Sequence, residues 1–233
     1  MSTTPDDYNL EQETASSIRM LEEIIPARLL KAYHLLNENA LNFESWRIDL
    51  FAKLLRNVEV NFLELRETIG KDRLPAAAWV ARNLLELWIW VKYCGAARDN
   101  AWRYHEDALR DMKGLSDLQK KLCELRGIED ETSNGRAHRI KAAARQLGLD
   151  DVDANYLAVS RAAAADGVNL SPLYSTSHRF LSKFAHPTAG LVIGFMHQDE
   201  PRSGMQAVCT TWGVYFAEQC TLEGQRTLAG REP

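Results

Sequence analysis

The chain has 233 residues, of which 45% are hydrophobic and 26% charged, a composition typical of a globular protein with a buried core. Its net charge of −4 provides no overall positive field, which disfavours wholesale adhesion to nucleic acid or membranes. The most apolar stretch, 84–91, contains Glu86 and is far shorter than the roughly 20 residues of a membrane span. The acidic first 25 residues contain no apolar run and so predict no secretory leader. With four scattered cysteines, these features predict a cytoplasmic protein with reduced thiols and no membrane partner.

Helical periodicity dominates the chain. Apolar residues recur every three or four positions in 10–39 and 43–69, and Pro26 predicts a kink in the first of these segments. A third helix is predicted over 75–94, between Pro75 and Gly95. Glycines, including Gly114, separate shorter predicted helices at 99–112, 116–126, 134–147 and 151–165. Two further helices are predicted, at 171–186 and 204–222, with a turn or short hairpin over 188–202. The sequence therefore predicts an all-α, single-domain, mostly antiparallel helical bundle of about seven to nine helices over 10–223, with flexible termini at 1–9 and 224–233.

The segment 171–186 carries an unusual polar edge. Proline fits the first turn of a helix at Pro172 and disfavours helical geometry just before Pro187, which fixes both predicted ends. At about 100° per residue, two hydroxyls, a guanidinium and an imidazole share one stripe: Ser175, Arg179, Ser182 and His186. A separate apolar stripe faces the core: Leu173, Phe180 and Phe184. The polar stripe is suited to binding and processing a phosphate; alternatively, it is a solvated edge on which His186 caps the helix.

The segment 75–94 is apolar nearly all round, which is typical of a central helix in a bundle. Its few polar side chains, Arg82, Asn83 and Glu86, are therefore expected to be partly buried, where a charge needs a partner. Arg82 and Glu86 are four residues apart and can form an ion pair. That pair either fixes helix register or lines the same pocket as Arg179 and His186.

Other candidate sites in the sequence are weaker. The run 135–145 holds four basic residues and a histidine without an acid, and so either steers a polyanion toward the site or is a solvated helix face. His34 and Glu38 are four residues apart and so would share one face of a helix. A helical metal-dependent oxygenase would require at least three metal ligands in a recognisable pattern, and the sequence shows none. Glycine-rich phosphate loops and nucleophile motifs are also missing from the sequence. The sequence therefore predicts no metal and no cofactor.

Two features of the chain resemble known families. Arg179 and His186, with six residues between them, fit the loose Arg-x(4–6)-His motif of the HEPN superfamily (higher eukaryotes and prokaryotes nucleotide-binding domains). The pattern Arg82-x-x-x-Glu86, followed by Tyr174, Ser182 and His186-Pro187, resembles an uncharacterised bacterial family known as domain of unknown function 5677. The resemblance covers roughly residues 45–220.

The resemblance implies a helical bundle that dimerises and, in active members, cleaves RNA without a metal. By that analogy His186 is the general acid or base, Arg179 holds the phosphate and Ser182 orients it. The remaining candidates would bind substrate: Arg82, Glu86, Tyr174, Ser175 and His178. It further implies an RNA substrate, a homodimer, and a toxin or phage-defence role with a neutralising partner protein. The alternative is a non-catalytic binding or assembly module in which the Arg, Glu and His residues form a structural network.

Overall fold

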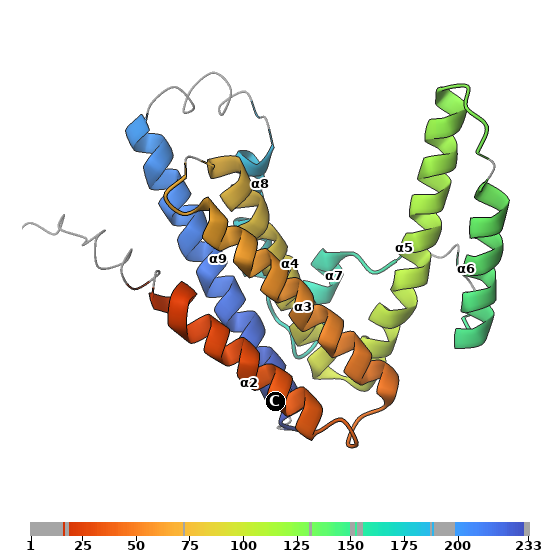
Figure 1. The fold of residues 1–233 in the computed structure, drawn as a ribbon, viewed down its shortest axis with the longest axis horizontal. Helices are drawn as coiled ribbons and strands as arrows, with labels where there is room; N and C mark the ends of the chain where they lie inside the picture. Colours follow the sequence, from red (N-terminus) through yellow and green to blue (C-terminus); the bar gives the residue numbers. More distant parts are fainter. Residues whose placement is uncertain are drawn as a thin grey trace, which may run out of the picture.

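The computed structural model describes residues 16, 19–71, 73–130, 132–149, 152, 156–186, 188 and 199–230. Over these residues the chain forms one π-helical turn and eight α-helices, with no strand, which confirms the predicted all-α bundle (Figure 1). The elements are η1 (Met20–Ile24), α2 (Ile25–Glu38), α3 (Ser45–Thr68), α4 (Leu74–Ala96), α5 (Arg98–Leu125), α6 (Ser133–Leu147), α7 (Val159–Ala164), α8 (Ser171–Ala185) and α9 (Asp199–Leu228). None of the described helices combines the length and apolar character that a membrane span requires.

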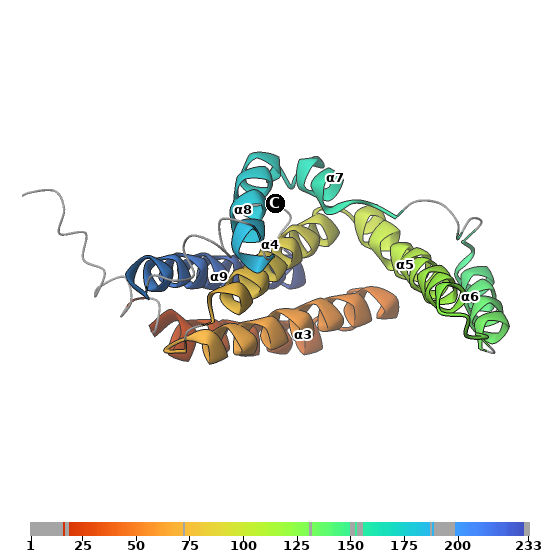
Figure 2. The same ribbon diagram turned by 90° about the horizontal axis from the view of Figure 1, so that it is seen from above.

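Helix α4 is the centre of the bundle, as its apolar sequence predicts. It contacts α3, α5, α7, α8 and α9, and its most extensive contact is with α9. Figures 1 and 2 show α3 and α9 running alongside it, with α8 on another side. Leu84, Leu85 and Ile89 of α4 are fully buried in the core of the protein. Because α4 touches so many neighbours, its few polar side chains lie at helix–helix contacts.

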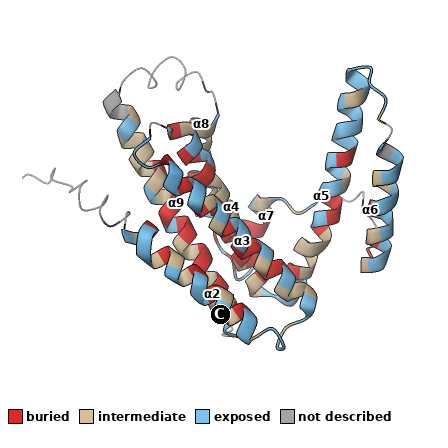
Figure 3. Ribbon diagram, viewed as in Figure 1, coloured by how far each residue is buried: buried red, intermediate tan, exposed pale blue. Residues whose placement is uncertain are grey.

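The hairpin of α5 and α6 extends away from the rest of the bundle in both views (Figures 1 and 2). A small apolar cluster of its own, Leu109, Ala144 and Leu149, holds the two helices together. Figure 3 shows that exposed and intermediate residues dominate this hairpin. Four exposed leucines at spacings of three and four form what we call the α5 leucine face: Leu115, Leu118, Leu122 and Leu125. A folded surface seldom exposes a continuous apolar stripe that has no partner.

The break predicted at Gly114 is wrong, because α5 continues unbroken from Arg98 to Leu125. Gly114 is exposed inside the helix, and a Cβ added there would touch nothing within 4 Å. Glycine in a helix interior costs only about 1 kcal/mol relative to alanine, which a 28-residue helix can tolerate. The helix predicted over 151–165 is likewise shorter, since within the described residues it covers only Val159–Ala164.

The chain ends differ from the sequence expectations as well. Helix α9 extends to Leu228, whose side chain is 1% exposed, so the flexible terminus predicted over 224–233 is wrong for its first five residues. Burial of Leu228 explains this extension of the helix. At the other end of α9, residues 199–202 are helical, whereas 189–198 of the predicted turn and the terminus 1–9 lie outside the described residues. Near Pro26, the π-helical turn η1 gives way to α2, with the proline in the first turn of α2.

Candidate functional site

Helix α8 carries the polar edge found in the sequence. It begins at Ser171, and His186 follows its last residue in an extended conformation (φ −118°, ψ 151°), as expected for a residue before proline. Pro187 itself lies outside the described residues. The predicted apolar stripe packs against the main core, and the Phe180 ring lies 5.6 Å from that of Trp212 in α9. This contact fixes the rotation of α8, and with it the polar side chains that face α4.

Side chains of α4 and the α8 segment meet in what we call the Arg–Glu–His cluster, formed by Arg82, Glu86, His178 and His186. Within α4, Arg82 Nε donates to Glu86 Oε1 at 3.1 Å. Arg82 Nη1 lies 3.3 Å from His186 Nε2. His178 Nε2 lies 3.7 Å from the same Glu86 oxygen. The structure thus joins a guanidinium, a carboxylate and two imidazoles that come from two separate parts of the sequence.

The cluster opens to solvent at one end. The side chains of Arg82, Glu86 and His178 are only 25–27% exposed, whereas His186 is exposed. A guanidinium only donates hydrogen bonds, so His186 Nε2 must accept at this contact. That role belongs to the tautomer whose ring hydrogen is on Nδ1. Nε2 is then the only basic nitrogen, so His186 can accept a proton from a hydroxyl of a bound ligand once Arg82 donates to that ligand's phosphate instead.

Burial and neighbouring charges shift two pKa values in the cluster. Burial lowers the pKa of His178, and the positive charge of Arg82 lowers it further, while Glu86 partly offsets both. Tyr174 packs on His178, with 4.9 Å between ring centroids. Its pKa is raised, first by burial and then by the Glu86 carboxylate. These shifts favour the neutral forms of both His178 and Tyr174 at neutral pH.

Two members of the predicted stripe do not join the cluster. Arg82, not Arg179, contacts His186, and Arg179 is exposed without a hydrogen bond or ion pair to any described residue. Ser175 is also exposed, and its Oγ donates to the Pro172 carbonyl at 3.0 Å. The reason is the rotation of α8 about its own axis. Its packing turns the edge that carries Tyr174 and His178 toward α4. Each residue is offset by about 100° from the next, so Ser175 and Arg179 point elsewhere.

Ser182 lies on α8 one turn before His186. Its Oγ is buried and has no hydrogen-bond partner among the described residues. A buried hydroxyl without a partner costs about 1–3 kcal/mol, which is a reason to expect a role for it. The role of orienting a phosphate stays a prediction for Ser182.

One spacing in the sequence points to the observed edge. Tyr174, His178, Ser182 and His186 follow one another at intervals of four residues, and a run of that kind stays roughly on one helix face. The stripe chosen from the sequence did not include His178. That residue was expected only to bind substrate, although in the structure it lies against Glu86. By contrast, Asn83 of α4 belongs to a different contact, since its amide donates to Asn61 of α3 at 3.1 Å.

The basic run 135–145 lies on α6, far from α8 in both ribbon views (Figures 1 and 2). Arg136 forms an ion pair with Asp130, while His138, Arg139, Lys141 and Arg145 are exposed. These positions agree with a solvated helix face rather than with a surface that borders the cluster. Among the described residues, no three or more His, Cys, Asp or Glu side chains come together as a metal site would require.

No family model, curated protein or solved structure matches the chain. Membership of the HEPN superfamily therefore stays a prediction that rests on the residues quoted above. Which function the chain performs has to be inferred from the side chains that the fold brings together at the Arg–Glu–His cluster.

Proposed function

We propose that the chain is a HEPN-like, metal-independent endoribonuclease whose reacting groups belong to the Arg–Glu–His cluster. The observation that supports this most directly is the 3.3 Å contact between Arg82 Nη1 and Nε2 of the exposed His186. It pairs a group that binds phosphate with a group that transfers protons, and these are the two functions that cleavage of an RNA strand requires.

In the proposed reaction His186 accepts the proton of a ribose 2′-hydroxyl, whose oxygen attacks the adjacent phosphorus. The bond from phosphorus to the 5′ oxygen breaks, and the proton held by His186 is returned to that oxygen. Arg82 stabilises the negative charge that develops on the phosphoryl oxygens. The products are a 2′,3′-cyclic phosphate and a 5′-hydroxyl end.

Other polar groups have supporting roles in this proposal. Glu86 holds Arg82 in place through the 3.1 Å ion pair, and the same carboxylate oxygen lies 3.7 Å from His178 Nε2. Exposed Arg179 binds a neighbouring phosphate of the same strand rather than the scissile one. Ser182 orients the phosphate beside His186. A homodimer and a neutralising partner protein, as in a toxin or phage-defence system, follow from the family resemblance and are part of the proposal.

The test is incubation of purified protein with total bacterial RNA in EDTA, followed by gel electrophoresis and end-group analysis. Wild type should produce cyclic phosphate ends, and His186→Ala and Arg82→Met should not. His138→Ala is the matched control, because it removes an exposed histidine of α6 far from the cluster. Cleavage that persists in both cluster variants, or that is lost in the control, would exclude the proposed site.

A non-catalytic binding or assembly module is the second candidate, and the α5 leucine face favours it. Four exposed leucines on a projecting hairpin are suited to contact another protein. In that case the cluster is a structural link between α4 and α8. Arg82→Met would then lower stability by roughly 1–3 kcal/mol, because the partly buried Glu86 loses its ion-pair partner, and the wild type would have no ribonuclease activity.

A further inference from the structure

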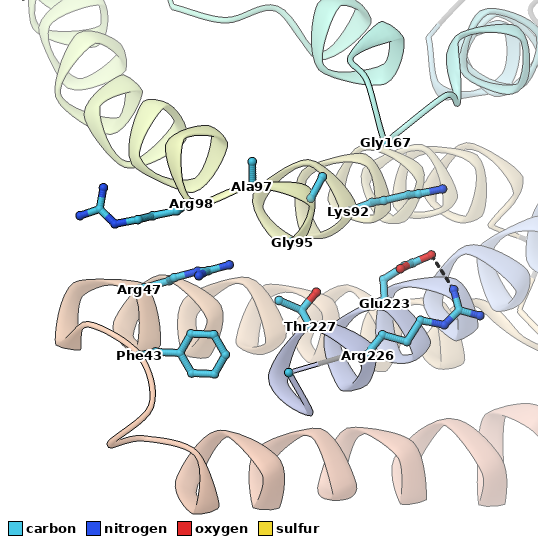
Figure 4. A pocket seen from close by; sticks show the side chains of 12 residues that line it. Phe43, Arg47, Lys92, Gly95, Ala97, Arg98, Gly167, Glu223, Arg226 and Thr227 are labelled. Atoms are coloured by element: carbon cyan, nitrogen blue, oxygen red, sulfur yellow. Dashed lines mark hydrogen bonds and ion pairs between the residues drawn. The ribbon is translucent and has the colours of Figure 1, made fainter. Parts of the chain in front are cut away.

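A second cavity lies where the C-terminal ends of α4 and α9 meet the beginnings of α3 and α5 (Figure 4). Its volume is about 1100 Å³, enough for a small organic molecule. The charged side chains on its walls are Arg47, Lys92, Arg98, Arg226 and Glu223. Four cations and one acid surround this space, although the chain as a whole is acidic.

Two of these cations are already neutralised by acids of the chain. Arg226 pairs with Glu223 at 3.0 Å, as Figure 4 shows. Arg98 pairs with Glu44, and that hydrogen bond lowers the pKa of the Glu44 carboxyl. Figure 4 also shows the Arg98 side chain directed away from the centre of the cavity. These two arginines therefore leave little positive charge for a ligand.

Arg47 and Lys92 are different, because the side chain of neither forms an ion pair or hydrogen bond with any residue that the structure describes. The Nε of Arg47 is buried and has no hydrogen-bond partner there, while its guanidinium carbon lies 5.0 Å from the centre of the Phe43 ring. A buried donor without a partner is unfavourable, and a ligand that accepts from it would remove that cost. The charge of Arg47 does act on the Glu44 carboxyl, but the side-chain hydrogen bond of Glu44 is to Arg98. Arg47 and Lys92 are therefore the two cations of this wall without a direct acid partner among the described residues.

Backbone donors add to this positive potential. Helix α5 begins at Arg98, and the residue before it, Ala97, has no side-chain oxygen with which to cap the first turn. Both residues line the cavity, so the positive end of a 28-residue helix is at its wall. Gly95 lets α9 approach closely, since a Cβ at this position would lie 2.4 Å from Thr227 Oγ1. A larger residue at 95 would move the wall that carries Thr227.

We propose that this cavity binds a small organic phosphate with at least two negative charges, held by Arg47 and Lys92. Phosphate matches the donors better than a carboxylate does, because its three terminal oxygens can accept from a guanidinium, an ammonium and backbone N–H groups at once. The cavity is much larger than a phosphate ion, and Phe43 and Ala96 provide apolar wall for the carbon skeleton. This site is separate from the Arg–Glu–His cluster and does not depend on its proposed chemistry.

Isothermal titration calorimetry of the full chain tests the proposal, with fructose 1,6-bisphosphate, pyrophosphate, citrate and glucose as probes. The bisphosphate should bind more tightly than citrate, and glucose should not bind. Arg47→Met and Lys92→Met should each weaken bisphosphate binding about tenfold or more, the usual value of a charge-assisted hydrogen bond. Lys53→Met is the matched control, because Lys53 is also on α3 but pairs with Asp49 and is outside the cavity wall.

Thermal unfolding of the same variants separates a binding role from a structural one. If Arg47 serves a ligand, Arg47→Met should lose binding while its Tm stays equal to that of wild type or rises, because a buried donor without a partner is removed. Failure of both phosphates to bind below about 1 mM would overturn the proposal, as would equal affinity in wild type and both variants. Tighter binding of citrate would overturn the assignment to phosphates. His186→Ala should bind the bisphosphate as wild type does.

Discussion

Two glycines inside helices, Gly114 of α5 and Gly213 of α9, should respond in opposite ways to replacement by alanine. Alanine is more favourable than glycine in a helix interior by about 1 kcal/mol, so both substitutions add the same helix propensity. At Gly114 nothing lies within 4 Å of the added Cβ, and the gain should be realised. At Gly213 the Cβ would lie 2.7 Å from Leu65 Cδ2 and 3.3 Å from the Cβ of Ala81. The second site is therefore overpacked.

The size of the difference follows from these distances. Carbon atoms prefer separations of about 3.5–4.0 Å, and forcing an extra methyl group into a packed core costs about 1–3 kcal/mol. Gly213→Ala should thus lower the free energy of unfolding by about 0 to 2 kcal/mol, while Gly114→Ala should raise it by about 1 kcal/mol. For a chain of this length, 1 kcal/mol corresponds to a Tm change of about 2–4 °C.

Thermal unfolding followed by circular dichroism measures both effects. Trimming the neighbour with Leu65→Val should make Gly213→Ala less harmful than it is in the wild-type background, because the two side chains compete for the same space. A rise in Tm for Gly213→Ala equal to that for Gly114→Ala would refute the close packing of α9 against α3. A fall in Tm for Gly114→Ala would show that α5 is not a continuous helix at that point.

Three further predictions concern His178, the α5 leucine face and the four thiols. Because the folded-state pKa of His178 lies below its unfolded value of about 6.5, it contributes stability that is present above pH 6.5 and is lost as the pH falls through its folded-state pKa. A pH series of Tm values should consequently be flatter for His178→Gln, and parallel curves for the two proteins would contradict the shift. Leu118 and Leu122 are each 59% exposed, so Leu118→Ser with Leu122→Ser should change the Tm of a monomer by no more than about 2–4 °C. A much larger fall, or conversion of a dimer to a monomer in light scattering, would show that the leucine face is covered in solution. Among the four thiols, Cys123 should react first with Ellman's reagent, because the other three are buried and burial raises their pKa values, that of Cys209 to about 12. Rapid labelling that survives Cys123→Ser would contradict that burial.

The Arg–Glu–His cluster was only partly predictable. The sequence identified α8 as a candidate site helix and expected Arg82 and Glu86 to be partly buried, because few polar residues interrupt an otherwise apolar helix. It paired His186 with Arg179, because both share one helix and are close in sequence. The contact found in the structure joins residues 104 positions apart. Pairing over such a distance depends on how α8 packs against α4, and no local pattern records that packing.

The sequence by itself determined the all-α class, most helix positions and the apolar character of α4, because hydrophobic periodicity and proline act over one or two turns. Only the tertiary structure decided which edge of α8 faces α4, why α5 passes through Gly114, and why α9 continues to the buried Leu228. It also brought Arg47 and Lys92 to one cavity, although they come from different helices. The physical reason is that burial and close contact depend on the sum of all packed surfaces. The hydrophobic periodicity that predicts a helix, in contrast, depends only on the residues of that helix.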